Sequence, residues 1–188
     1  MIELARRRLA ELPHAEVFPG DITDFSLGRS FDGAICPINT LLHLSPSELA
    51  CHLEAMADHL RPGARYLIQL ALYDPEHDEA ALRASQWEMT RGDSALKISW
   101  ETQDVDLSDA RVRQRSRIEF FSRPRAGEVL EETHEMTAWT PERWRAAVEQ
   151  SRFDVTATYD GDRDDRARVP EGSAGLMLWH ELTCATSP

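Results

Sequence analysis

One stretch, residues 31–72, most constrains the fold because it encodes two apolar runs separated by a helix. The first run, FDGAICPI, turns polar at Asn39, and the second, YLIQLAL, follows the turn Arg61-Pro62-Gly63. Between them, Ser45-Pro46-Ser47-Glu48 forms a capping box with proline at the first helical position. Continuous apolar runs of this kind predict strands that are buried on both faces of a parallel sheet.

The same stretch predicts a strand–helix–strand unit with a right-handed crossover. The helix is expected to cover Pro46–Leu60, with Gly63 in the stop position. In such a sheet, ligands bind at the carboxyl ends of the strands. The turn after the first strand is therefore the first place to look for a functional site.

Upstream of this unit, the pattern predicts a helix over Met1–Leu12 and a short strand over Ala15–Phe18. The turn Pro19-Gly20 follows that strand and leads to Asp21. A carboxylate at such a position either meets a ligand or caps the turn, and the sequence leaves both roles open.

Downstream, the period of the pattern changes to the alternation of antiparallel strands. Four strands are expected, with turns between them, at Trp87–Arg91, Leu96–Gln103, Arg111–Phe121 and Val129–Trp139. A short helix is expected before them, between Tyr73 and Ala84. After them, Thr140 caps a helix that runs to about Gln150, and strands follow at Phe153–Tyr159 and Ala174–Cys184.

Composition excludes several classes of partner. The formal net charge of -12 argues against a broad surface for nucleic acid or for anionic membranes. No apolar run approaches the roughly 20 residues that span a bilayer. The three cysteines form no zinc pattern and no disulfide framework, and the acidic loop 160–172 lacks calcium-loop spacing. We therefore expect a cytoplasmic protein with no metal site.

Taken together, these motifs resemble the class I methyltransferases that use S-adenosylmethionine (SAM). The resemblance rests on the helix MIELARRRLA, the Gly20-Asp21 turn, the Cys36–Thr40 turn, the Leu60–Arg65 turn, and an antiparallel insert before a Thr-Pro-Glu helix. It is strongest to small-molecule enzymes that N-methylate amino groups on nucleotide-linked sugars. The fold it implies is α/β: an incomplete Rossmann-like methyltransferase sheet in residues 1–84 and 140–188, with an antiparallel β-meander insert in 85–139, which would serve substrate binding, a lid or dimerisation.

The resemblance also implies site residues. Asp21 and Ile22 would lie by the adenine of SAM, and Cys36 and Pro37 by its methionine part, while Leu42 would pack near the cofactor. Cys36 is equally compatible with the role of a small buried strand residue.

Residues for the acceptor come from the turn after the first strand and from the insert. His43 is either the general base or a histidine that serves helix approach or the core. The insert residues that would contact substrate are Trp87, Arg91, Trp100 and Trp139, and the alternative is that the tryptophans form a small core under the meander.

One departure from the family is large, because the chain has no glycine-rich SAM loop and lacks the first two family strands. The sequence therefore predicts an N-terminally truncated chain with an uncovered sheet edge. Three arrangements would account for that edge: the short strand Ala15–Phe18 moves in to pair there, another chain supplies the missing pairing, or the chain is a fragment of a longer polypeptide. The expected function is methyl transfer from SAM to a small-molecule acceptor. The alternative is an inactive methyltransferase-like interaction module or homodimer.

Overall fold

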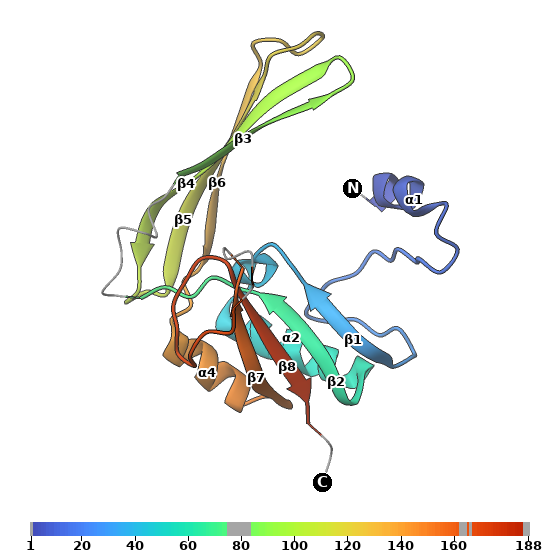
Figure 1. The fold of residues 1–188 in the computed structure, drawn as a ribbon, viewed down its shortest axis with the longest axis vertical. Helices are drawn as coiled ribbons and strands as arrows, with labels where there is room; N and C mark the ends of the chain where they lie inside the picture. The colour runs from blue at the N-terminus through green and yellow to red at the C-terminus, as the bar shows by residue number, and fades with distance from the viewer. Residues whose placement is uncertain (1, 75–83, 162–164, 166, 186–188) are drawn as a thin grey trace.

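The computed structural model describes residues 2–74, 84–161, 165 and 167–185. Two four-stranded sheets organise this part of the chain, a core sheet in the order β1-β2-β8-β7 and an insert sheet in the order β3-β4-β5-β6 (Figure 1). The elements are α1 (Ile2–Leu9), β1 (Phe31–Cys36), the 3-10 helix η1 (Thr40–His43), α2 (Pro46–His59), β2 (Leu60–Gln69), β3 (Ala84–Arg91), β4 (Ser94–Asp106), β5 (Arg111–Phe120), β6 (Val129–Thr137), α4 (Pro141–Glu149), β7 (Phe153–Asp160) and β8 (Leu178–Cys184).

The predicted strand–helix–strand unit is confirmed, because β1 and β2 are parallel neighbours joined through α2. The capping box forms as expected, with Ser45 and Glu48 bonded reciprocally across the helix start. The prediction that Gly63 stops the helix is wrong. Residue Leu60 caps α2 in an extended conformation, and Gly63, with φ of 79°, lies three residues further on, within β2, where the register with β1 shifts.

Burial of both strands on both faces is also wrong for β1. Ile35 is 62% exposed, and the burial of β1 alternates because helices cover only one of its faces. β1 is an edge strand that pairs with β2 alone among the described strands. β2, in contrast, lies between β1 and β8 and carries the buried residues Tyr66 and Ile68, with buried Leu70 directly after its end.

The strand predicted at Ala15–Phe18 is not formed. Between α1 and β1, the only pairing is an isolated bridge from Asp21 to Asp24, so the arrangement in which a short strand slides in beside β1 is excluded. α1 is a helix as expected, but none of its described residues is buried and it stands away from the core sheet in Figure 1. The segment Ala15–Phe18 would need a paired neighbour to form a strand, and the structure gives it none.

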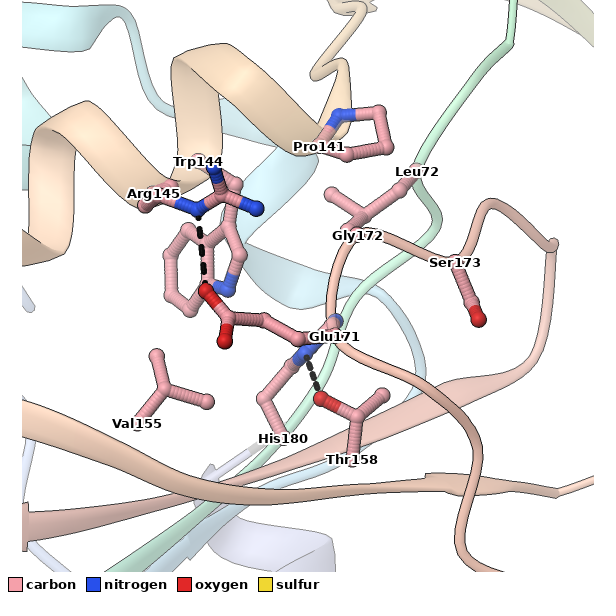
Figure 2. A pocket seen from close by; sticks show the side chains of 10 residues that line it. All are labelled: Leu72, Pro141, Trp144, Arg145, Val155, Thr158, Glu171, Gly172, Ser173 and His180. Carbon is pink, nitrogen blue, oxygen red and sulfur yellow. Dashed lines mark hydrogen bonds and ion pairs between the residues drawn. The ribbon is translucent and has the colours of Figure 1, made fainter.

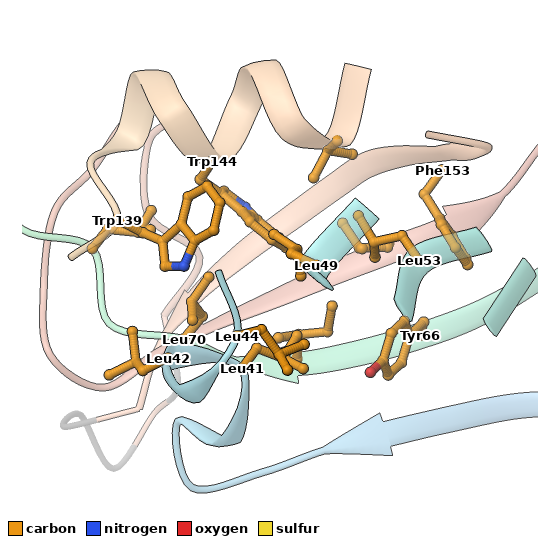
Figure 3. Packing of buried hydrophobic residues seen from close by; sticks show 14 of the residues in the cluster. Leu41, Leu42, Leu44, Leu49, Leu53, Tyr66, Leu70, Trp139, Trp144 and Phe153 are labelled. Atoms are coloured by element: carbon orange, nitrogen blue, oxygen red, sulfur yellow. The ribbon is translucent and has the colours of Figure 1, made fainter. Parts of the chain in front are cut away.

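The core lies between the core sheet and the layer formed by α2 and α4 (Figure 3). Leu41 and Leu42 of η1 and Leu49 and Leu53 of α2 are at most 2% exposed, and they face the buried side chains of β2. Trp144 of α4 closes the cluster over β8. Leu49, Leu53 and Ala57 are spaced along one face of α2, and this face is the buried one.

The insert sheet has two unlike faces, as the alternation of its strands predicted. Its charged face carries a lattice of ion pairs whose distances run from 2.6 to 3.0 Å: Arg113–Glu135, Arg115–Glu101, Arg117–Glu119 and Arg117–Glu131. Because these pairs are solvent-exposed, each contributes only about 0.2–1 kcal/mol. The opposite face carries Trp100, Gln114, Ser116 and His134 at cross-strand positions.

The short helix expected between Tyr73 and Ala84 falls mainly on residues 75–83, outside the described residues. Within the part of the chain that the structure describes, no helix combines the length and apolar character needed to cross a membrane.

A buried histidine predicts a pH dependence of stability. His180 is 2% exposed, and burial lowers its pKa from 6.5 to about 4. The folded state therefore favours the neutral ring, and its contribution is complete above about pH 6.5 and lost as pH falls toward 4. We expect the free energy of unfolding to fall by about 3 kcal/mol over that window, measured by urea titration.

The matched variant is His180→Gln, which cannot gain a proton. Its unfolding free energy should fall less steeply between pH 6.5 and 4 than that of the parent chain. Equal slopes for the two proteins would assign the acid sensitivity to other groups.

Candidate functional site

The turn at the carboxyl end of β1 is held in a strained conformation. Ile38 and Asn39 have positive φ angles of 62° and 51°, a region that β-branched residues rarely adopt. Gln69 of β2 holds the turn, because its Oε1 accepts the Ile38 N–H at 2.8 Å. The Thr40 hydroxyl donates to the Pro37 carbonyl at 2.8 Å. Strain that the surroundings maintain in this way is a reason to look for function here.

The segment that carries Asp21 forms a tight turn of its own. The Thr23 N–H and hydroxyl donate to Asp21 Oδ1 at 2.9 and 2.7 Å, and these bonds lower the pKa of the Asp21 carboxyl. Asp21 is exposed and ionised at neutral pH, so it caps the turn and still presents charge to solvent. Ile22, which is 38% exposed, turns its carbonyl toward His52 of α2.

The residues expected beside a methionine group differ in accessibility. Cys36 is half-buried, and burial raises the pKa of its thiol. Pro37 is exposed, whereas Leu42 is 2% exposed and belongs to the core. Leu42 can therefore influence the turn only through its packing in the core, not by contact with a ligand at the surface.

His43 lies where η1 meets the insert sheet. Its ring is edge-on to His134 of β6, with 6.2 Å between centroids, and His134 stacks on Trp100 of β4 at 4.8 Å and 18°. Thr137 of β6 donates to the Leu44 carbonyl at 2.7 Å, which fixes the insert against the end of η1. His43 is thereby brought to the aromatic face of the insert.

Two polar side chains complete this His43–His134–Trp100 cluster. His134 Nε2 lies 3.0 Å from the Ser116 hydroxyl, and the Trp100 indole N–H donates to Gln114 Oε1. Sequence reasoning did not single out His134, Ser116 or Gln114. The alternation of β5 and β6 was the available signal, since it places all three on the face of Trp100.

The remaining predicted substrate residues lie elsewhere. Trp139 is 3% exposed within the main core (Figure 3). Trp87, 45% exposed, pairs with Ile98 on the same face of the insert sheet as Trp100 but outside the ring contacts of the cluster. Arg91 adjoins the hairpin at Gly92, which points away from the core sheet in Figure 1. The structure therefore gathers Trp100 and His43, but not Trp87, Arg91 or Trp139, into one cluster.

A cavity between α4 and the sheet is not the site of a large ligand. Figure 2 shows its lining, where Arg145 pairs with Glu171 across the opening at 3.1 Å and His180 contacts Thr158. The cavity measures about 30 Å³, the volume of roughly one water molecule. Among the described residues, no cluster of three or more acidic, histidine or cysteine side chains could hold a metal ion.

No family model matches the chain. The chain is similar to a dTDP-3-amino-3,6-dideoxy-alpha-D-glucopyranose N,N-dimethyltransferase of Streptomyces fradiae, with 28% identity over 157 residues. The match covers 82% of this chain and 58% of that protein, so the chain spans less than two thirds of this relative's length.

Solved structures share the fold. A SAM-bound amino pentose methyltransferase from Micromonospora echinaspora has a TM-score of 0.69 and 19% identity, over 97% of this chain and 69% of its own. A sugar N-methyltransferase from Streptoalloteichus has a TM-score of 0.70 and 18% identity, over 99% of this chain and 69% of its own. The predicted resemblance to class I SAM-dependent methyltransferases, and with it the Rossmann-like α/β fold class, is confirmed.

The strained turn generates a prediction about stability. The side chain of Ile38 is 81% exposed, so Ile38→Gly removes little packing and relieves a φ of 62°. We expect the free energy of unfolding to rise by about 1 kcal/mol in denaturant titration. The matched control is Ile35→Gly, at an exposed position in the regular strand β1. This substitution should lower the free energy of unfolding by about 0.5–1 kcal/mol. Destabilisation by both substitutions would show that the turn is not strained.

Proposed function

We propose that the chain provides the acceptor-side part of a SAM-dependent methyltransferase that methylates the amino group of a nucleotide-linked sugar. The support from relatives is the similarity to the Streptomyces fradiae N,N-dimethyltransferase and the shared fold of sugar N-methyltransferases. The match covers 58% of the length of the former.

The observation that carries this proposal is the meeting of the insert face with the carboxyl end of β1. His43, His134 and Trp100 lie in ring contact there, next to a strained turn. An aromatic plane beside imidazole and hydroxyl groups suits a sugar, whose ring has apolar faces and polar edges. Ligand sites of open α/β sheets occur at this end of the strands.

The residues present fit part of a SAM site. Asp21 and Ile22 would contact the adenine side, while Cys36, Pro37 and the packing of Leu42 would shape the methionine side. The end of β1 is accessible to such a ligand, since Pro37 is exposed and the Ile38 side chain is 81% exposed. The chain contains no GxGxG motif, so a glycine-rich grip on the cofactor is not among its residues.

Bound SAM would supply an electrophilic methyl group. Before transfer, the amino group of the acceptor must lose its proton so that its lone pair is available. His43 is the exposed imidazole of the cluster and would accept that proton. Trp100 and His134 would orient the sugar, and orientation supplies much of the rate of such a transfer.

A second candidate function has its own observation. β1 leaves one edge unpaired among the described strands, and Ile35 and Ile38 beside it are 62% and 81% exposed. Unpaired strand edges pair readily with other chains. The chain would then act as an inactive methyltransferase-like module, or as a homodimer through this edge or through the insert. A monomer in light scattering that binds SAM tightly would contradict this second function.

A substitution at His43 tests the catalytic assignment. With a dTDP-linked amino sugar as acceptor, His43→Gln should lower kcat by about 100-fold or more at neutral pH, because the base is lost. The loss should shrink at high pH, where solvent deprotonates the amine. The measurement is methyl transfer followed by mass spectrometry, with calorimetry to follow SAM binding.

The control is His14→Gln, an exposed histidine outside the cluster, which should leave the rate unchanged. A chain that binds no SAM and transfers no methyl group would contradict the proposed function. Full activity of His43→Gln at neutral pH would remove His43 from the role of base while leaving the methyltransferase assignment in place.

A further inference from the structure

Two histidines of α2, seven residues apart, contact the otherwise irregular segment 19–30. His52 and His59 are 4% and 7% exposed, and they bind the segment at Ile22 and Leu27. Among the described residues, the segment forms no helix and no strand beyond the Asp21–Asp24 bridge. The position of Asp21 therefore depends on contacts such as these.

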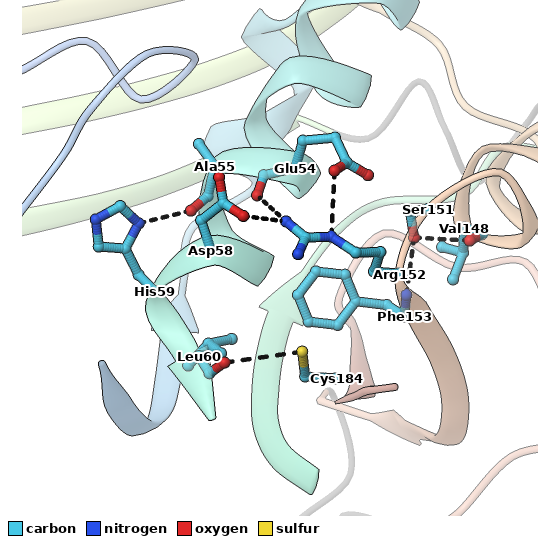
Figure 4. Close-up of polar contacts among 10 residues, drawn as sticks. All are labelled: Glu54, Ala55, Asp58, His59, Leu60, Val148, Ser151, Arg152, Phe153 and Cys184. Carbon is cyan, nitrogen blue, oxygen red and sulfur yellow. Dashed lines mark hydrogen bonds and ion pairs between the residues drawn. The ribbon is translucent and has the colours of Figure 1, made fainter. Parts of the chain in front are cut away.

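At each ring, one backbone partner fixes the protonation of the nitrogen that it contacts. At His52, Nδ1 lies 2.7 Å from the Ile22 carbonyl oxygen, which can only accept, so Nδ1 carries the proton. At His59, Nε2 lies 2.9 Å from the Leu27 N–H, which can only donate, so Nε2 is bare. The Nδ1–H of His59 then donates to the Ala55 carbonyl at 2.7 Å (Figure 4).

His52 also reaches the end of β1 through a tyrosine. Burial lowers the pKa of His52, so its ring is neutral and Nε2 accepts a hydrogen bond from the Tyr66 hydroxyl at 2.8 Å. That hydroxyl in turn contacts the Cys36 thiol. Tyr66 is 1% exposed, so the contact is shielded from water. A continuous chain of polar contacts thus runs from Ile22 through His52 and Tyr66 to Cys36.

If these side chains only filled space, apolar residues would serve equally well, because burying them carries no desolvation cost. A buried polar network in which every member has a partner instead fixes one arrangement, because any displacement leaves a donor or acceptor unpaired. Here the two ends of the network are the two segments that would contact opposite parts of one cofactor.

We propose that His52 and Tyr66 are positioning residues that set the spacing between the Ile22 segment and the Cys36 turn, with His59 as a second tether at Leu27. The consequence for cofactor binding rests on the proposed function, whereas the tether itself is a property of the free chain. Holding two parts of a site within a fraction of an ångström is what ligand binding requires of such residues.

Substitutions in the free chain test the tether. His52→Leu, Tyr66→Phe and His59→Leu each remove hydrogen bonds. In contrast, His52→Asn keeps an amide N–H donor near the position of the ring Nδ1, and His59→Gln keeps an amide oxygen acceptor near the position of the ring Nε2. We expect amide exchange of Leu27 to accelerate at least about fivefold in His59→Leu, and that of Thr23 and Asp24 similarly in His52→Leu. The two conservative variants should restore protection, and amides of β2 should stay unchanged.

Equal exchange in parent and variants, or loss of protection throughout β2, would overturn the proposal. So would NMR detection of the proton on Nε2 in either ring. His14→Leu, at an exposed position, serves as the control.

Titration with SAM separates this proposal from the proposed function. If the parent binds, His52→Leu and Tyr66→Phe should weaken binding at least tenfold, and His52→Asn should weaken it less. Unchanged affinity in both would overturn the positioning role. If the parent does not bind, the proposed function fails, and the role in cofactor spacing falls with it. The exchange experiment then still decides whether the tether exists.

Discussion

Parallel hydrogen bonding between β1 and β2 is the constraint on which the rest of the molecule depends. It requires a crossover, and α2 provides it with a capped start and an apolar stripe. The crossover brings the carboxyl end of β1 beside Gln69 of β2, whose side chain holds the turn at Ile38. η1 then carries His43 toward the insert. Each step follows from the one pairing.

The insert depends on the core sheet for its position. Its charged face is stabilised by cross-strand pairs of small individual energy, and its other face meets the core only at one end. The Thr137 hydrogen bond to Leu44 and the His134 contact with His43 lie at that end. The chemistry proposed for the site therefore requires both sheets, although each sheet forms its own hydrogen bonds.

The segment before β1 shows how a site segment can be ordered without regular structure. Its residues bury little apolar surface, and α1 has no buried residue among those described. Order comes instead from side chains of α2, where His52 and His59 satisfy backbone groups that a neighbouring strand would otherwise pair. An apolar pattern cannot reveal this arrangement, because the histidines read as ordinary polar interruptions of a helix.

Local signals in the sequence determined the helix α2, the two parallel strands, the four-stranded insert and the resemblance to methyltransferases. Capping boxes, hydrophobic periodicity and turn residues act over a few positions, so they can be recognised in the sequence before the tertiary structure is known. Tertiary structure alone decided three things: that Ala15–Phe18 is not a strand, that β1 is exposed on one face, and that His134 meets His43. Each depends on which segments become neighbours, and burial and pairing are properties of neighbours rather than of residues.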